Sequence, residues 1–474
     1  MDGRGFRLRP PVAWFLSACS PDLMKNKLLY TALVSLVVAL GGFLLGFDAG
    51  VVSGANPLYR DYFGLNDWAL GWSVGCLTFG AMMGNAVAGL LADRFGRKPV
   101  LSVAAVFYTV SAVTSALATD FTFFIVARML GGVAVGLALL IAPIYIAEIS
   151  PAKLRGRFVS INQLNIVIGF SFVFFSNYYV LMLAESGSLE FINKPNAWRW
   201  MLGLETVPAA LYFVLLFFVP RSPRWLAQQG REDEALHVLR KVNEPEEAVQ
   251  SLESIKEHIR SESGNRPRFR ELLSPRMRFI MFIGLGVGFF QQITGINAIF
   301  FYAPTIFEKT GLSQGDAFLQ TVIIGLVNLG FTFVAIAFID RFGRKPLLLV
   351  GTAAMAICLL ANAWAFHSAT YELSTEAISA LPVEAATALM PLAGESFDNQ
   401  FTLVEAIESA GAGSYASDLV NQSMVINAKL VLFAIIGFIA AFAFSIGPVM
   451  WAMFSEIFPD RLRGLAISVA GFFN

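Results

Sequence analysis

Ten long apolar runs, separated by shorter polar segments, dominate this sequence. A bilayer core needs about 20 apolar residues per helix. Because backbone polar groups in a bilayer must bond within their own segment, such runs fold as helices. The sequence therefore predicts an all-α membrane protein with spans near residues 28–55, 69–91, 99–119, 121–147, 158–182, 200–219, 278–308, 317–339, 346–366 and 428–454.

The composition agrees with a membrane environment and excludes several classes of function. Hydrophobic residues make up 56% of the chain and charged residues only 14%, whereas soluble domains carry about 25% charged residues. Lys plus Arg (34) equals Asp plus Glu (34), so there is no basic surplus to bind nucleic acid. Three cysteines, two of them within apolar runs, do not favour a disulfide framework or a metal cluster. We expect the lipid bilayer as surroundings, and no metal or cofactor.

Positive charge sets the expected orientation. Lys and Arg concentrate on the cytoplasmic side of membranes, and here they follow the second, fourth, eighth and tenth runs. This places the N-terminus in the cytoplasm of a multi-pass cell-membrane protein. Residues 220–277 carry both charge signs and amphipathic runs, so we expect a cytoplasmic helical linker domain there. Residues 367–427 contain eight acids and no Lys or Arg, so we expect an acidic insertion on the outer face.

The N-terminal extension, residues 1–27, has two interpretations. Three arginines precede a short apolar run that ends at Cys19, which resembles a lipoprotein cleavage site. Lys25 and Lys27 before the first span instead favour a terminus that stays in the cytoplasm, with an unstructured extension upstream of a start at Met24.

The sequence also contains an internal repeat. Asp93-Arg-Phe-Gly-Arg-Lys-Pro99 recurs as Asp340-Arg-Phe-Gly-Arg-Lys-Pro346, and the stretch 148–156 is echoed at 456–464. Two homologous halves, here 28–219 and 278–474, are typical of transporters that rock around a site at the membrane midplane. The repeated acids and bases are predicted to hold the cytoplasmic side shut; the alternative is that they only set the topology. These candidate gating residues are Asp93, Arg97, Glu148, Arg155, Asp340, Arg344, Glu456 and Arg463.

Several motifs in order resemble the sugar porter family of the major facilitator superfamily. The resemblance implies two pseudo-symmetric six-helix bundles, with the second incomplete here because an eleventh apolar run begins at Leu465 and stops at Asn474; we therefore expect this chain not to transport as it stands. Two departures are Arg221, where the family commonly has Glu, and Phe301, where it commonly has Tyr. The matching motifs are Gly46-Phe-Asp-Ala-Gly50, Arg128-Met-Leu-Gly-Gly132, Pro143-Ile-Tyr-Ile-Ala-Glu148, Trp198-Arg-Trp200, Gln291-Gln-Ile-Thr-Gly-Ile-Asn297 and Gly447-Pro-Val-Met-Trp451.

Amide side chains in apolar helices are the candidate sugar ligands. Gln163, Gln291, Gln292 and Asn297 lie within predicted spans, where an unpaired amide is costly. They must therefore face a cavity or bond another helix. An unwinding near Gly295 would help the last three converge. Further sugar contacts that the resemblance implies are Asn328, Trp451 and Asn474.

Three charges are predicted inside the bilayer: Asp48, Arg128 and Glu205. Counting about 1.5 Å per residue from the outer helix ends puts Asp48 and Arg128 at similar depth, so they can pair. Intramembrane acids are functional candidates, although a static ion pair is the alternative. In the resembling family, Asp at the position of Asp48 is typical of proton-coupled members.

The sequence thus predicts a proton-coupled monosaccharide importer and not an enzyme, with Asp48 as proton acceptor, Arg128 as its partner and Glu205 as an auxiliary acid. Its expected partners are the sugar, the proton and the bilayer. A facilitative uniporter and a sugar sensor that binds without transport are the alternatives. Neither the particular sugar nor the oligomeric state follows from the sequence; a monomer is compatible with it.

Overall fold

The computed structural model describes residues 21–474 apart from 152–153, 265–268, 380, 460–461 and 473–474. In this part of the chain, ten helices or helix pairs are long and apolar enough to cross a membrane, and they coincide with the ten predicted spans. The prediction of a multi-pass helical protein is confirmed. Residues 1–20 of the expected N-terminal extension lie outside the described residues.

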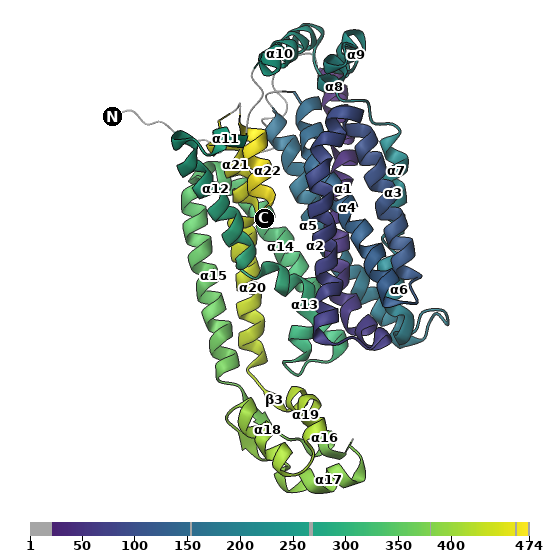
Figure 1. Ribbon diagram of the computed structural model, residues 1–474, viewed down its shortest axis with the longest axis vertical. Coiled ribbons are helices and arrows are strands. Elements are labelled where there is room, and N and C mark those ends of the chain that lie inside the picture. The colour runs from purple at the N-terminus through teal and green to yellow at the C-terminus, as the bar shows by residue number, and fades with distance from the viewer. Residues whose placement is uncertain (1–20, 152–153, 265–268, 380, 460–461, 473–474) are drawn as a thin grey trace.

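Two groups of membrane helices lie side by side (Figure 1). The first group comprises α1 (Pro21–Phe63), α2 (Asp67–Phe95), α3 (Arg97–Ala116), α4 (Phe121–Ile149), α5 (Arg155–Ser186), the short η3 (Lys194–Asn196), α6 (Ala197–Gly203) and α7 (Thr206–Leu216). The second group comprises α12 (Pro275–Ile293), α13 (Ile296–Glu308), α14 (Gln314–Phe342), α15 (Arg344–His367), α20 (Ala428–Phe444), α21 (Ile446–Ile457) and α22 (Arg463–Phe472).

Four helices connect the two groups at one end of the molecule (Figure 1). They are α8 (Pro223–Gln228), α9 (Glu232–Val242), α10 (Pro245–Gly264) and α11 (Phe269–Leu272). Helix α8 begins with Ser222 as its N-cap and Pro223 at its first position, a favourable start for a helix. This short helix packs against α9 and contacts α4, so it lies over the end of the first group.

Glycine allows α2 and α4 to cross closely in the first group. At Gly80 of α2, an added Cβ would lie 2.3 Å from the carbonyl oxygen of Met129 in α4, and at Gly132 it would lie 2.1 Å from the carbonyl oxygen of Leu77. Small residues let membrane helices approach until their backbones touch. The glycines therefore hold α4, and with it Arg128, at a fixed distance from its neighbours.

The acidic insertion between α15 and α20 forms a small subdomain with its own apolar core. Its elements are β1 (Thr370–Glu372), α16 (Thr375–Ser379), α17 (Val383–Leu389), η4 (Met390–Leu392), β2 (Ser396–Phe397), α18 (Gln400–Ser409), η5 (Gly413–Tyr415), α19 (Ala416–Ser423) and β3 (Met424–Val425). Leu373, Ile378, Leu389, Leu403 and Ile407 are fully buried in this core.

The three short strands of the insertion are a difference from the predicted all-α fold. Strand β1 pairs antiparallel with both β2 and β3. The physical reason is connectivity: β1 follows α15 and β3 precedes α20, and these two helices pack side by side. The ends of these helices therefore deliver two extended segments to the same place, where their backbone groups pair.

The two helix groups meet through few elements. Helix α5 packs against α14, and α1 against α13. The Ser171 hydroxyl donates to the carbonyl oxygen of Gly325 (2.8 Å), and the Asn56 amide donates to that of Phe301 (3.1 Å). Asn56 is seven residues before the last residue of α1, so this contact lies toward the Phe63 end of the helix.

Candidate functional site

A buried ion pair joins α1 to α4. The guanidinium of Arg128 donates to the carboxylate of Asp48 and also, at 3.1 Å, to the backbone carbonyl oxygen of Asp48. Each side chain is only 1% exposed. The predicted pairing of these two residues is confirmed. The second carboxylate oxygen of Asp48 has no hydrogen-bond partner among the described residues.

Glu205 is a second buried acid beside this pair. It is 2% exposed, and its charge acts on both Asp48 and Arg128. Glu205 lies where the sixth span breaks between α6 and α7. Since Pro208 has no N–H to bond the carbonyl oxygen of Leu204, that oxygen accepts from Val207 instead, at 3.2 Å. Glu205 is buried at this irregular turn, and the charge of Arg128 therefore acts on two buried carboxyl groups.

The sequence did not point to three residues that line this cluster. Tyr108 of α3 is fully buried, and both acids act electrostatically on its hydroxyl, which has no partner among the described residues. Cys76 of α2 is buried next to the same charges. At Gly131, an added Cβ would lie 3.0 Å from the carboxylate of Asp48 and 2.5 Å from the hydroxyl of Ser111. The only sequence signal for any of them was Gly131 within the motif that follows Arg128.

The second group of helices carries amides at its membrane break. The expected unwinding is present: α12 ends at Ile293, and Gly295 has φ +86° before α13 begins. Across this break the Asn297 amide donates to the Gln292 side chain at 2.6 Å. Gln291 is buried. Two of the three amides that were expected to converge therefore touch.

The remaining candidate sugar ligands are spread over both groups. Gln163 is half-buried in α5, and its side chain has no hydrogen-bond partner among the described residues. Asn328 is buried in α14, the helix that packs against α5. Trp451 is half-buried in α21, with its ring 5.9 Å from that of Phe454. Asn474 lies outside the described residues. No hydrogen bond joins Gln163 to Asn328 or Trp451 in the structure.

The first copy of the repeated motif forms a closed charge network. Arg97 donates to Glu148 at 3.0 Å and to Asp93 at 3.3 Å. Glu148 also accepts a 2.5 Å hydrogen bond from Ser222, just before α8. Arg155, another candidate gating residue, is exposed at the start of α5 and forms no ion pair with a described residue.

The second copy of the repeated motif forms the equivalent ion pair, which is less buried. Arg344 donates to Glu456 at 2.6 Å, and both side chains are partly exposed. The side chains of Asp340 and Arg463 lie outside the described residues. Each of the two pairs joins helices of its own group, so each braces one half of the protein. Their role as cytoplasmic gates stays a prediction.

Two repeated groups of membrane helices, with buried charges in one and amides at a helix break in the other, define a secondary transporter of the major facilitator fold. The sequence profile described as "Sugar (and other) transporter" matches residues 34–389 and 405–474. The chain belongs to this sugar transporter family.

Curated relatives and a solved structure resemble most of the chain. The arabinose-proton symporter of Bacillus subtilis (strain 168) is 33% identical over 453 residues, covering 96% of this chain and 84% of the relative. The glucose transport protein of Synechocystis sp. is 37% identical over 454 residues, covering 95% and 87%. The structure of the proton:xylose symporter XylE bound to 6-bromo-6-deoxy-D-glucose has a TM-score of 0.72 and 32% identity, covering 94% and 86%.

Proposed function

We propose that the protein imports a monosaccharide by alternating access, with a proton moving in the same direction. The observation that carries the proton part is the buried cluster of Asp48, Arg128 and Glu205. Relatives named as arabinose-proton and D-xylose-proton symporters support the proposal.

The charge balance of the cluster gives a mechanism for proton coupling. One guanidinium cannot neutralise two buried carboxylates, so the cluster reaches neutrality by holding one proton. The pair of Asp48 and Arg128 bridges α1 and α4. If a change of conformation within the first half, linked to the rocking of the two halves, separates Arg128 from Asp48, the freed carboxylate in an apolar interior takes up a proton, and re-forming the pair releases it. The electrostatic effect of both acids on the Tyr108 hydroxyl supports a role for this residue in stabilising the neutral acid.

The sugar is assigned to the space between the two halves. Gln163 from the first half and Gln291, Gln292 and Asn297 from the second supply groups that both donate and accept hydrogen bonds, as ring hydroxyls require. Trp451 supplies an apolar face for the C–H surface of the sugar. Contacts of α1 with α13 near the outer end support assigning the described conformation to a state closed on the outside.

Replacing Asp48 by Asn tests the proton-coupling role. The amide keeps the shape and a hydrogen bond to Arg128 but cannot carry a proton, so we expect Asp48→Asn to abolish accumulation against a gradient and to retain sugar exchange. The measurement is sugar uptake and proton influx in proteoliposomes of the protein expressed from its gene. Asp61→Asn, at an exposed position of the same helix, is the matched control.

Three outcomes discriminate between the candidate functions. Unchanged accumulation and proton influx in Asp48→Asn would show that Asp48 is not the coupling residue. Uptake by the unmodified protein that a protonophore does not affect would identify a uniporter. Sugar binding without uptake would identify a sensor. A competition panel of unlabelled sugars then finds the substrate among arabinose, xylose, glucose and galactose.

The proposed topology places the N-terminus in the cytoplasm and the acidic insertion outside the cell. Ser396 is exposed in β2 of the insertion. With the native cysteines replaced, Ser396→Cys is expected to react with an impermeant maleimide on intact cells. Reaction only after permeabilisation would invert the topology.

A further inference from the structure

An apolar groove lies on the surface of the first helix group, between α3 and α7. It has a volume of about 230 Å³ and is lined by Ser102, Val103, Val106 and Phe107 of α3 and by Phe213 of α7. Both helices lie on the side of the first group that faces away from the second (Figure 1). In a membrane this surface meets lipid acyl chains, and the proposed transport path does not use it.

Two positive side chains lie at one end of this groove. Lys98 donates to the carbonyl oxygen of Phe217 at 3.0 Å, which ties the start of α3 to the end of α7. The Phe217 ring lies 5.1 Å from that of Phe213, so the apolar lining extends toward the lysine. At about 1.5 Å per residue, Phe107 lies about 13.5 Å deeper along α3 than Lys98. The charge thus marks the interfacial end of the groove.

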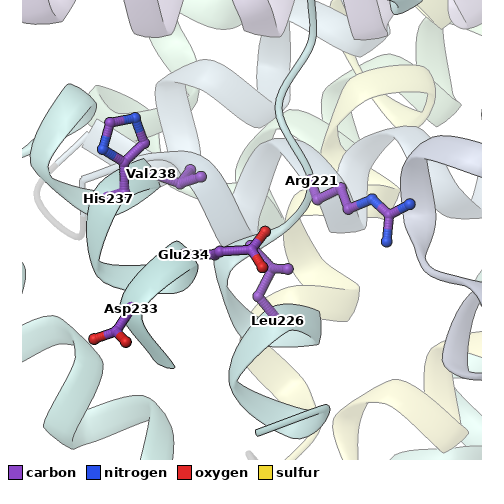
Figure 2. A pocket seen from close by; sticks show the side chains of 6 residues that line it. All are labelled: Arg221, Leu226, Asp233, Glu234, His237 and Val238. Atoms are coloured by element: carbon purple, nitrogen blue, oxygen red, sulfur yellow. The ribbon is translucent and has the colours of Figure 1, made fainter. Parts of the chain in front are cut away.

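The second positive side chain is Arg221, and its charge acts directly on Lys98. In the described part of the chain, no carboxylate oxygen lies within 4.0 Å of either group. Arg221 also borders a hollow of about 290 Å³ beside α9. Figure 2 shows its guanidinium pointing away from Asp233 and Glu234, and it lies 5.3 Å from the ring of Trp225. Two like charges therefore lie close enough to repel each other, and neither forms an ion pair with a carboxylate of the described residues.

An anion held by both groups removes this repulsion and forms charge-assisted hydrogen bonds. We propose that an anionic phospholipid occupies this place, with its phosphate between Lys98 and Arg221 and an acyl chain in the groove. Basic pockets between membrane helices on the cytoplasmic side bind such headgroups. The leaflet assignment rests on the proposed topology, which puts this end of α3 at the cytoplasmic face.

The lipid also has a structural consequence. Arg221 directly precedes Ser222, which caps α8 and bonds Glu148, and the Tyr145 hydroxyl donates to the carbonyl oxygen of Pro220 at 2.7 Å. A headgroup that holds Arg221 therefore fixes the segment that carries α8 over the network of Arg97 and Glu148. Binding is expected to raise the melting temperature of the protein.

The test measures phosphatidylglycerol binding to the purified protein in a neutral detergent, by native mass spectrometry and by thermal melting. The unmodified protein is expected to bind phosphatidylglycerol and to melt higher in its presence. Phosphatidylcholine is expected to give no such shift. Arg221→Gln and Lys98→Gln should each weaken binding about fivefold. Arg94→Gln, an exposed arginine three residues before Arg97, is the matched control and should bind normally.

Two further variants test the proposal independently if Lys98→Gln folds poorly. Arg221→Glu supplies a partner for Lys98 and should remove binding, while Val106→Trp should fill the groove and weaken binding with both cations present. Equal binding in Arg221→Glu, or an equal shift with phosphatidylcholine, would overturn the proposal. A shift with glycerol 3-phosphate alone would instead show a free-anion site. None of these measurements needs sugar or a proton gradient, so their failure would leave the proposed transport unaffected.

Discussion

The two copies of the repeated motif have the same bonding pattern in different surroundings. Arg97 donates to the carbonyl oxygen five residues earlier, and Arg344 does the same, each at 3.1 Å. Each arginine also binds a glutamate at the end of another helix. The side chains of Arg97 and Glu148 are 7% and 8% exposed, whereas those of Arg344 and Glu456 are 30% and 48% exposed.

The cause of this difference lies outside the repeat. Helix α8 covers the first copy: the Trp225 indole N–H donates to the carbonyl oxygen of Asp93 at 3.2 Å, and an added Cβ at Gly96 would lie 3.1 Å from the Trp225 ring. The Ser222 hydroxyl bonds Glu148. Identical motif residues therefore set the local geometry, while the neighbouring segment sets how strongly each pair contributes to stability.

The largest expected effect follows from breaking the covered pair. Arg97→Met removes the cation and leaves Glu148 buried with one hydroxyl partner. Removing one member of a buried pair costs about 3–5 kcal/mol, so we expect a clear fall in the melting temperature of the purified protein. Arg94→Met makes the same change at an exposed position of the same motif and should melt near the unmodified protein. An equal fall in melting temperature in the two variants would show that burial beneath α8 does not make the pair important for stability.

A smaller effect is expected from crowding the membrane site in one half only. At Gly131, the Cβ of Gly131→Ala would press on the hydroxyl of Ser111 and the carboxylate of Asp48, so the ion pair must shift. Because this crowding disturbs the geometry of the pair, proton-driven uptake should fall clearly below that of the unmodified protein. The matched change in the second half, Gly286→Ala, meets nothing within 4 Å and should leave uptake unchanged. Similar uptake in both variants would show that the space at Gly131 does not matter for proton coupling.

The features that could be predicted from the sequence are those that depend on helix length and on the local chemistry of single residues. Counting residues from the helix ends was enough to pair Asp48 with Arg128, since depth in a bilayer follows directly from helical rise. The break at Gly295 was predictable because glycine adopts a positive φ without strain. Family resemblance and the repeated motifs were enough to predict the fold.

Other features depend on packing that the sequence pattern does not carry. Membrane helices are apolar on every face, so nothing in the pattern showed that Tyr108 and Cys76 turn toward the buried acids. The strands of the acidic insertion have only two or three residues each, too few for an alternating pattern. The unequal burial of the two arginines was likewise hidden, because their motifs are identical.

The smallest expected effect follows from breaking the exposed pair. Arg344→Met removes the 2.6 Å contact with Glu456, but water solvates both groups in either state, and ordering two long side chains offsets most of their attraction. We expect a loss of about 0–1 kcal/mol. Salt sharpens the contrast: at about 1 M, where the Debye length is about 3 Å, the effect of Arg344→Met should vanish while that of Arg97→Met persists. If Arg344→Met instead lowers the melting temperature as much as Arg97→Met, in low and high salt alike, then the motif itself and not the cover by α8 determines the stability of these helix ends.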